Sequence, residues 1–174
     1  MVLTFNAPTR QPPGSKPPRV SDTPSLERKG VQSGLNLFLR LKSPAQMLPL
    51  MLTIKSVQAQ IDTALAGLHY VHFARFLPSQ DYSTLMVITV FDGNPSTNHY
   101  MDSLDSYLMD FVATIGDEFT AMLMFIQNAP RLPVKQYPQD FLDFVRQNVQ
   151  VGAQPWSAYP DMTVIDIQNA LSPR

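Results

Sequence analysis

LHYVHFARFLPSQDYSTLMVITVFDG, residues 68–93, is the stretch that decides the fold. Aromatic, β-branched and other apolar residues fill Leu68–Phe76 and again Thr84–Phe91, which is the composition of β-strands. The polar segment PSQDYS separates the two runs, and the turn pair Asp92-Gly93 ends the second one. The stretch therefore predicts a β-hairpin.

Upstream of the hairpin, the sequence predicts a strand followed by an amphipathic helix. Leucines alternate with other residues over residues 34–42 (GLNLFLRLK), and a period of two is typical of a half-buried strand. Ser43-Pro44 is a common helix start, and apolar residues then recur at helical spacing up to Gly67. Pro49 disfavours a regular first turn.

Downstream of the hairpin, the pattern changes to helices. Apolar residues at helical spacing predict one kinked helix or two helices over residues 104–126, and a shorter helix begins at Pro138. Residues 149–160 (VQVGAQPWSAYP) suit an edge strand, because Pro155 lacks the donor that a central ladder needs. Asp161 or Thr163 could cap a short terminal helix, and a strand over residues 163–167 is the competing alternative.

The order strand, helix, strand, strand, helix, strand predicts an α+β fold of the ferredoxin-like βαββαβ type, with an antiparallel sheet, helices on one face and an extra C-terminal helix. In many such domains the other face is closed by a second copy, giving a dimeric α+β barrel, and that expectation rests on analogy of fold. Residues 1–30 are rich in proline and poor in apolar residues, so we expect a disordered tail. Residues 31–174 are expected to form a single domain.

The composition of the chain limits the kinds of partner that we expect. The five cationic and two acidic side chains of residues 1–30 leave a mildly acidic body, so no phosphate-binding stripe is expected and nucleic-acid binding is not predicted. The chain has no cysteine, which removes disulfides and thiolate chemistry and fits a reducing cytoplasm. Neither a secretory signal nor a membrane-spanning run is recognisable, so a cytoplasmic protein without a membrane partner is expected.

Strand alternation assigns side chains to faces. His69 and His72 are three residues apart on one strand, so they point to opposite faces and do not form a metal clip; no metal site is expected. We assign the leucine row of residues 34–42 to the helices. On the next two strands we assign Val71, Phe73, Met86, Ile88 and Val90 to the helices, and Tyr70, His72, Phe76, Val87, Thr89 and Phe91 to the open face. A slip of one residue would exchange every assignment on a strand.

The open face is the candidate site. It is expected to combine apolar residues with a few polar groups, as small-ligand pockets do, although the same aromatic and arginine residues are typical of a dimer interface, which we favour. The ligand-binding candidates are His72, Arg40, Tyr70, Thr89 and Trp156. Secondary candidates are Arg75, Asp92 and Tyr159.

Two of these residues have specific alternatives. His72 could be a haem ligand or a general base, or a hydrogen-bonded structural residue. Arg75 is expected to pair with an acid such as Asp92 or to bind an anionic group. The sequence contains no nucleophile elbow, phosphate loop or HExxH pattern, so the usual motifs assign no enzyme class.

Three sequence blocks carry a resemblance: HFAR (residues 72–75), FDG (residues 91–93) and YPDMTV (residues 159–164). Together they resemble a poorly characterised bacterial family of ferredoxin-like proteins, over about residues 68–168. That family is similar in broad fold to the dimeric α+β barrels, which include haem-binding peroxidase-like, haem-degrading and cofactor-free oxidative proteins. No established catalytic role transfers with the matched positions, and the GxxDG arrangement of dye-decolourising peroxidases is incomplete here.

The sequence thus leads to a homodimeric ferredoxin-like protein that binds a partner or a small apolar ligand on its open sheet face. The alternative is an oxidative enzyme, haem-dependent or cofactor-free, in which His72 is ligand or base and Arg40 or Arg75 holds an anionic group. A third hypothesis is an interaction protein that uses its proline-rich tail.

Overall fold

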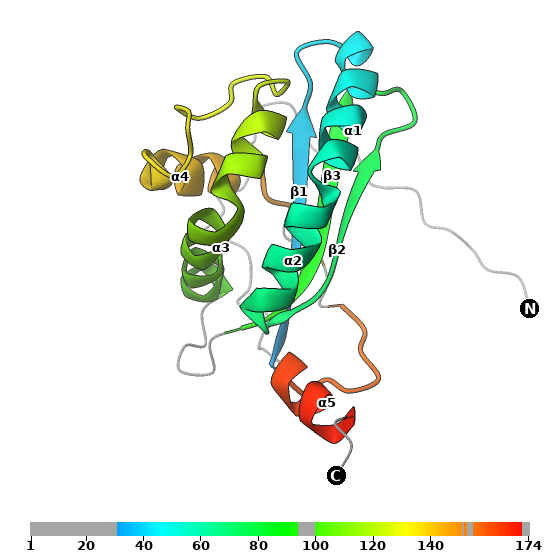
Figure 1. Ribbon diagram of the computed structural model, residues 1–174, viewed down its shortest axis with the longest axis vertical. Coiled ribbons are helices and arrows are strands. Elements are labelled where there is room, and N and C mark those ends of the chain that lie inside the picture. Colours follow the sequence, from blue (N-terminus) through cyan, green and yellow to red (C-terminus); the bar gives the residue numbers. More distant parts are fainter. Residues whose placement is uncertain (1–30, 94–99, 151, 153–154, 172–174) are drawn as a thin grey trace, which may run out of the picture.

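The computed structural model describes residues 31–93, 100–150, 152 and 155–171, and of residues 100–103 it describes the backbone alone. The expected tail of residues 1–30 lies outside this part. Figure 1 shows a sheet with α1 to α4 packed on one side and α5 beyond its end. The elements are β1 (Gln32–Arg40), the 3-10 helix η2 (Pro44–Gln46), α1 (Met47–Ser56), α2 (Gln58–Leu68), β2 (Val71–Pro78), β3 (Thr84–Asp92), α3 (Tyr100–Leu123), α4 (Pro138–Asn148) and α5 (Val164–Leu171).

The sheet has the order β1-β3-β2, and both pairings are antiparallel. The predicted hairpin is therefore confirmed as β2 and β3, and the α+β class is confirmed with it. At the free edge of β1, Leu37 forms an isolated antiparallel bridge with Val149, and the Gln150 N–H donates to the Asn36 carbonyl at 2.8 Å. Within the described residues, the predicted edge strand is therefore reduced to this bridge and the hydrogen bond beside it.

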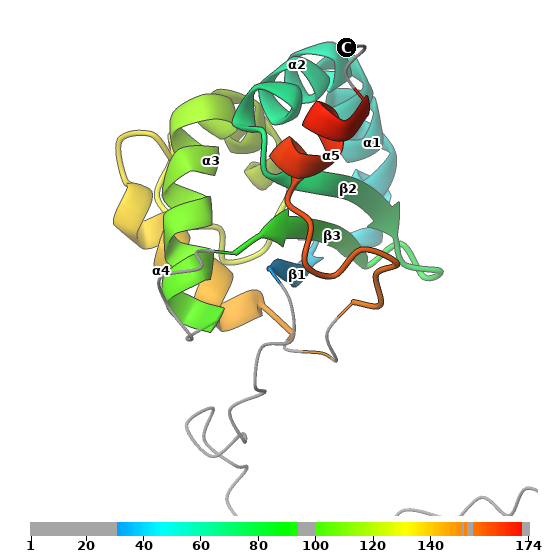
Figure 2. The same cartoon turned by 90° about the horizontal axis from the view of Figure 1, so that it is seen from below.

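The leucine row of β1 lies in the core, as predicted. Leu35, Leu37 and Leu39 are buried beneath the helices, whereas Phe38 and Arg40 are exposed on the opposite side. In Figure 2 the helices α1, α2 and α3 lie together on one side of the sheet. We call the opposite side, which carries Phe38, the uncovered face.

The predicted helices form with two interruptions. The helix expected over residues 44–67 is divided into η2, α1 and α2, and the break between α1 and α2 is at Val57, whose φ of −108° and ψ of 9° are not helical. The helix of residues 104–126 is α3, with a kink at Ile115 and a C-terminal end at Leu123. The kink lies one residue before Gly116, so the segment forms one kinked helix, which was one of the two predicted alternatives.

The facing assigned to β3 is wrong. Leu85, Val87 and Phe91 are buried in the core, and Phe91 stacks on Tyr107 of α3 with 4.2 Å between ring centroids. Met86 lies in the alternate row and is partly exposed. Both rows of β3 are apolar, so alternation alone could not distinguish them, and the stacking partner on α3 decides the register.

The facing assigned to β2 is half right, and a β-bulge explains why. Val71 pairs with Phe91 and Phe73 pairs with Val90, so His72 is the extra residue between them. Val71 packs against the core and His72 faces the other side, both as predicted. Beyond the bulge the alternation is reversed, because one extra residue shifts every later side chain to the opposite face.

As a consequence, Phe73 is on the uncovered face, and Ala74 and Phe76 face the helices. The predictions for Phe73 and Phe76 were therefore wrong. The ring centroid of Phe76 lies 6.5 Å from that of Phe119, and Phe76 packs, partly buried, against the core.

The leucine row offers a test of the core. Leu37→Ala should lower the free energy of unfolding by about 2–5 kcal/mol, because Leu37 is 1% exposed and its truncation leaves a cavity. Leu48→Ala on α1, 69% exposed, should change it by less than about 0.5 kcal/mol. Urea unfolding followed by circular dichroism measures both, and equal losses would contradict the assigned core.

Candidate functional site

A groove of about 280 Å³ lies on the uncovered face, at the end of the sheet nearest α5. The strands form its floor, and the segment that leads into α5 forms its wall. We call this segment, residues 155–163, the C-terminal strap. The lining residues are Gln32, His72, Phe73 and Val90 from the strands, residues 155–159 from the strap and Ile167 from α5.

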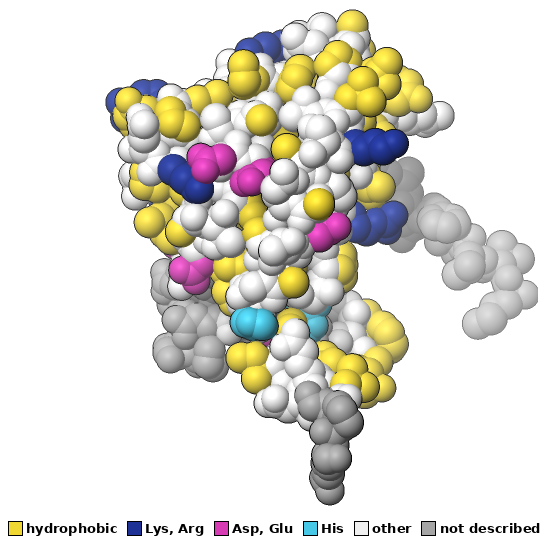
Figure 3. Space-filling model, in the orientation of Figure 1, with side chains coloured by type: hydrophobic (Ala, Val, Ile, Leu, Met, Phe, Trp, Pro, Cys, Tyr) yellow, Lys and Arg dark blue, Asp and Glu magenta, His cyan; other side chains and the backbone are white. Residues whose placement is uncertain are grey.

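The polar centre of the groove is a hydrogen-bonded pair. His72 Nε2 and Asp92 Oδ1 are 2.7 Å apart, and the two side chains are 14% and 10% exposed. The bulge in β2 turns His72 toward this side, and Asp92 is the last residue of β3. In Figure 3 the histidine side chains, in cyan, lie where the body of the protein meets α5.

Asp92 also holds the C-terminal helix. Its second oxygen, Oδ2, accepts a hydrogen bond from the Val164 N–H at 2.8 Å, and Val164 is the first residue of α5. A carboxylate is favourable at a helix N-terminus, where N–H groups lack partners within the helix. One side chain therefore links His72, β3 and α5.

The strap is fastened to the start of β1 by three hydrogen bonds. Gln32 Nε2 donates to the carbonyl oxygens of Tyr159 at 3.0 Å and Met162 at 3.3 Å. The Val31 N–H donates to the Pro160 carbonyl at 2.9 Å. These bonds keep the strap beside the sheet and form one wall of the groove.

A capping box begins α5. The Asp166 N–H donates to Thr163 Oγ1 at 3.1 Å, and the Thr163 N–H donates to Asp166 Oδ2 at 3.0 Å. The hydrogen bond from the Thr163 hydroxyl is the main cause that lowers the pKa of the Asp166 carboxyl. The prediction of a terminal helix capped at Thr163 is confirmed, and the competing strand over residues 163–167 does not form.

Of the predicted site residues, the structure brings His72, Trp156, Asp92 and Tyr159 together. Trp156 and Tyr159 project from the strap with large exposed rings, and both line the groove with His72. Asp92, a secondary candidate, contacts His72 directly.

Tyr70 and Thr89 are not part of the groove, and their assignment to the open face was wrong. The Tyr70 ring lies 5.9 Å from that of Tyr107 on the helix side, where burial, with a smaller contribution from the nearby Asp110 carboxylate, raises the pKa of its hydroxyl. Thr89 is buried and donates its hydroxyl to the Phe73 carbonyl at 2.8 Å. Thr89 follows the facing of β3, whereas Tyr70 lies just before β2 and packs against the core as Val71 does.

The two arginines are on the uncovered face but outside the groove. Arg40 is opposite Thr84 at the far end of β1, and Arg75 is opposite Ile88. Arg75 does not pair with Asp92, because its partner in the sheet is Ile88, four residues before Asp92 on β3. The candidate role of Arg40 and Arg75 as anion-holding groups at His72 is therefore not supported by their positions.

Gln32 is the site residue that sequence reasoning missed. The predicted strand began at Gly34, so Gln32 was assigned to the segment before it. Its contact with Tyr159 joins residues 127 positions apart, and a glutamine carries no charge or motif that would indicate this. No sequence signal could have found it.

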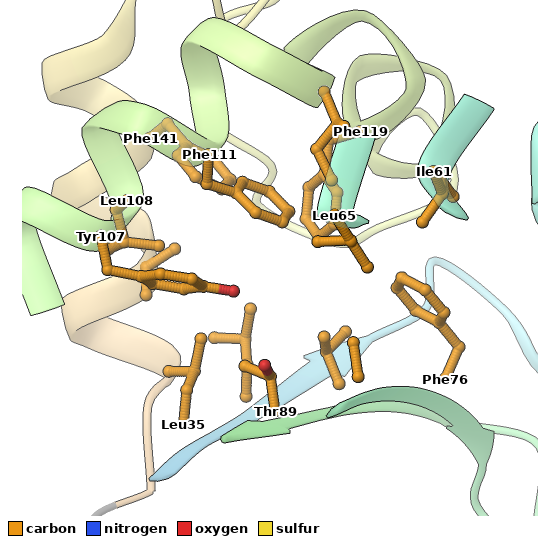
Figure 4. A pocket seen from close by; sticks show the side chains of 15 residues that line it. Leu35, Ile61, Leu65, Phe76, Thr89, Tyr107, Leu108, Phe111, Phe119 and Phe141 are labelled. Carbon is orange, nitrogen blue, oxygen red and sulfur yellow. The ribbon is translucent and has the colours of Figure 1, made fainter. Parts of the chain in front are cut away.

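A second hollow lies inside the core, between the sheet and α2, α3 and α4 (Figure 4). It holds about 20 Å³, enough for one water-sized particle. Tyr107, Phe111 and Phe119 point into it from α3, and Phe76 and Thr89 approach from the strands. Its size and apolar lining indicate imperfect packing rather than a ligand site.

The described residues offer few ligands for a metal ion or a haem iron. Within the described ranges, no three His, Asp or Glu side chains are grouped so that they could hold a metal ion. His72 has Nε2 committed to Asp92, which leaves Nδ1, the ring nitrogen nearest the backbone, for an iron.

Comparison of the chain with protein-family models, with curated proteins and with solved structures gave no match. The resemblance of the HFAR, FDG and YPDMTV blocks therefore stays a prediction. Among the described residues, no helix has both the length and the apolar character needed to cross a membrane.

The double role of Asp92 predicts the effect of removing it. Asp92→Ala should speed amide exchange of residues 164–171 by about tenfold or more, because a hydrogen bond to a charged acceptor contributes roughly 1.5 kcal/mol or more. His72→Ala keeps the Val164 contact and should have a smaller effect on the same amides. Hydrogen–deuterium exchange with mass spectrometry measures both, and equal exchange in wild type and Asp92→Ala would contradict the link.

Proposed function

We propose that this protein binds a small, largely apolar organic molecule in the groove, with His72 as its polar contact. The observation that carries the proposal is the His72–Asp92 pair, which is nearly buried at the floor of a hollow with aromatic walls. A mostly apolar hollow with a few fixed polar groups is the usual composition of a small-molecule site.

The dimensions of the groove support a ligand of one or two rings. Its volume of about 280 Å³ is close to the lower end of common ligand pockets, roughly 300–1,000 Å³. Trp156 is 88% exposed at its margin, and large aromatic rings left in water around a hollow are typical of binding surfaces. A bound aromatic molecule would cover part of this ring.

We also infer a ferredoxin-like arrangement and a homodimer. The Leu37–Val149 bridge lies at the free edge of β1, where the fourth strand of a βαββαβ sheet would pair. Outside the groove, the uncovered face carries Phe38, 39% exposed, with Met86 opposite it and Ile88 two residues further along β3. A second copy packed on this face would remove these side chains from water.

A cofactor-free oxidative enzyme is the second candidate, and the orientation of His72 favours it. A histidine held by a carboxylate through one nitrogen has the other nitrogen available to take a proton from a bound molecule. Oxygen uptake by the purified protein in the presence of a bound phenol tests this. No uptake above the buffer rate would exclude this enzyme and leave the binding function.

Probe binding tests the groove. N-phenyl-1-naphthylamine, a neutral fluorescent probe, should bind saturably and receive energy from Trp156, the single tryptophan of the chain. Phe73→Ala should weaken the affinity for the probe by about tenfold, because an aromatic ring that lines the groove is lost. Phe38→Ala, an exposed phenylalanine on the same face outside the groove, should keep the wild-type affinity. Equal effects of the two variants would contradict the groove as the site.

Sedimentation velocity tests the dimer. The wild-type chain should sediment as a dimer at micromolar concentration, and Phe38→Glu should sediment as a monomer, because a charge would be buried without a partner. Leu48→Glu on α1 is the control and should leave the dimer intact. A monomeric wild type would overturn the dimer without affecting the groove.

A further inference from the structure

We propose that the groove selects a neutral aromatic molecule that carries an O–H or N–H donor, such as a phenol, because both of its nearly buried polar side chains are held as hydrogen-bond acceptors. The inference rests on the proposed ligand-binding function and adds the chemical class of the ligand. It follows from the partners that fix His72 and Gln32.

Asp92 sets the state of the His72 ring. A carboxylate can only accept hydrogen bonds, so the hydrogen between His72 and Asp92 is on Nε2. In the neutral ring, Nδ1 then carries a lone pair and is an acceptor. Within the described part of the chain, Nδ1 takes part in no hydrogen bond, and His72 lines the groove.

Backbone carbonyls set the orientation of the Gln32 amide in the same way. Its Nε2 lies against the carbonyl oxygens of Tyr159 and Met162, and carbonyls only accept, so the amide cannot be reversed. The Oε1 atom is left as an acceptor, and no hydrogen bond to it forms among the described residues. Gln32 is 8% exposed and lines the groove beside His72.

Two fixed acceptors weaken the binding of ligands that lack a donor and of anions. A molecule without a donor would cover these atoms and leave them unpaired, which weakens binding. An anion would meet two lone pairs, and no lysine or arginine is among the described lining residues. The rings of Phe73, Trp156 and Tyr159 favour a flat aromatic body for the rest of the ligand.

The variant Asp92→Asn should reverse the hydrogen-bonding role of His72 in the groove. The Val164 N–H can only donate, so the amide oxygen of the new side chain must face it. The amide NH₂ then faces His72 Nε2, which has to become the acceptor, and the ring hydrogen moves to Nδ1. This variant keeps the contact with α5 but turns His72 from an acceptor into a donor toward the groove.

The experiment compares 4-cresol with 4-methylanisole, which replaces the hydroxyl by a methoxy group, using calorimetry and Trp156 emission at pH 8, where free imidazole is neutral. We expect the wild-type protein to bind 4-cresol at least about tenfold more tightly. Asp92→Asn should reduce this ratio to about threefold or less. Asp62→Asn on α2, whose carboxylate accepts only from Gln58 within the described residues, should keep the wild-type ratio.

The outcomes separate the two proposals. Equal affinity of the wild type for both compounds would overturn the donor preference and leave the groove as a binding site. Failure of both compounds to bind or to change Trp156 emission would overturn the proposed function as well. An unchanged ratio in folded Asp92→Asn would overturn the role of His72. The wild-type comparison needs no variant, so it decides the ligand class even where Asp92→Asn does not fold.

Discussion

The carboxylate of Asp92 is the constraint on which the site depends. One oxygen contacts the His72 ring and the other accepts the first N–H of α5, so the charge is nearly buried yet fully partnered. A buried carboxylate without partners would be costly, and this requirement brings together residues 20 and 72 positions apart. Because α5 is fixed there, the strap before it runs along the sheet and completes the groove.

The bulge in β2 is the second structural condition. A regular strand that placed Ala74 and Phe76 against the helices would also point His72 into the core, where the lining is almost entirely apolar. The extra residue reverses the facing locally, so the same strand contributes Phe76 to the core and His72 with Phe73 to the groove. Bulges commonly redirect a side chain in this way at functional sites.

Prediction from sequence succeeded where one local pattern had one interpretation. The leucine row of β1 alternates with polar and exposed residues, so only one facing buries it. The terminal helix had a strand as its alternative, and the hydrogen bonds between Thr163 and Asp166 decide for the helix. Prediction from sequence failed on β3, because both rows of that strand are apolar and only the stacking of Phe91 on Tyr107 decides between them. The site candidate Thr89 was assigned to the wrong face for the same reason.

The sequence by itself determined the hairpin, most of the helices, the α+β class and the presence of His72, Asp92 and Trp156 near strand ends and turns, because these follow from residue type and short-range spacing. The tertiary structure alone decided which of them meet. The contacts of Gln32 with the strap and of Asp92 with α5 are single hydrogen bonds between distant segments. Such bonds leave no periodic trace in the chain, since they depend on how the packed helices and the bulged strand bring the segments into reach.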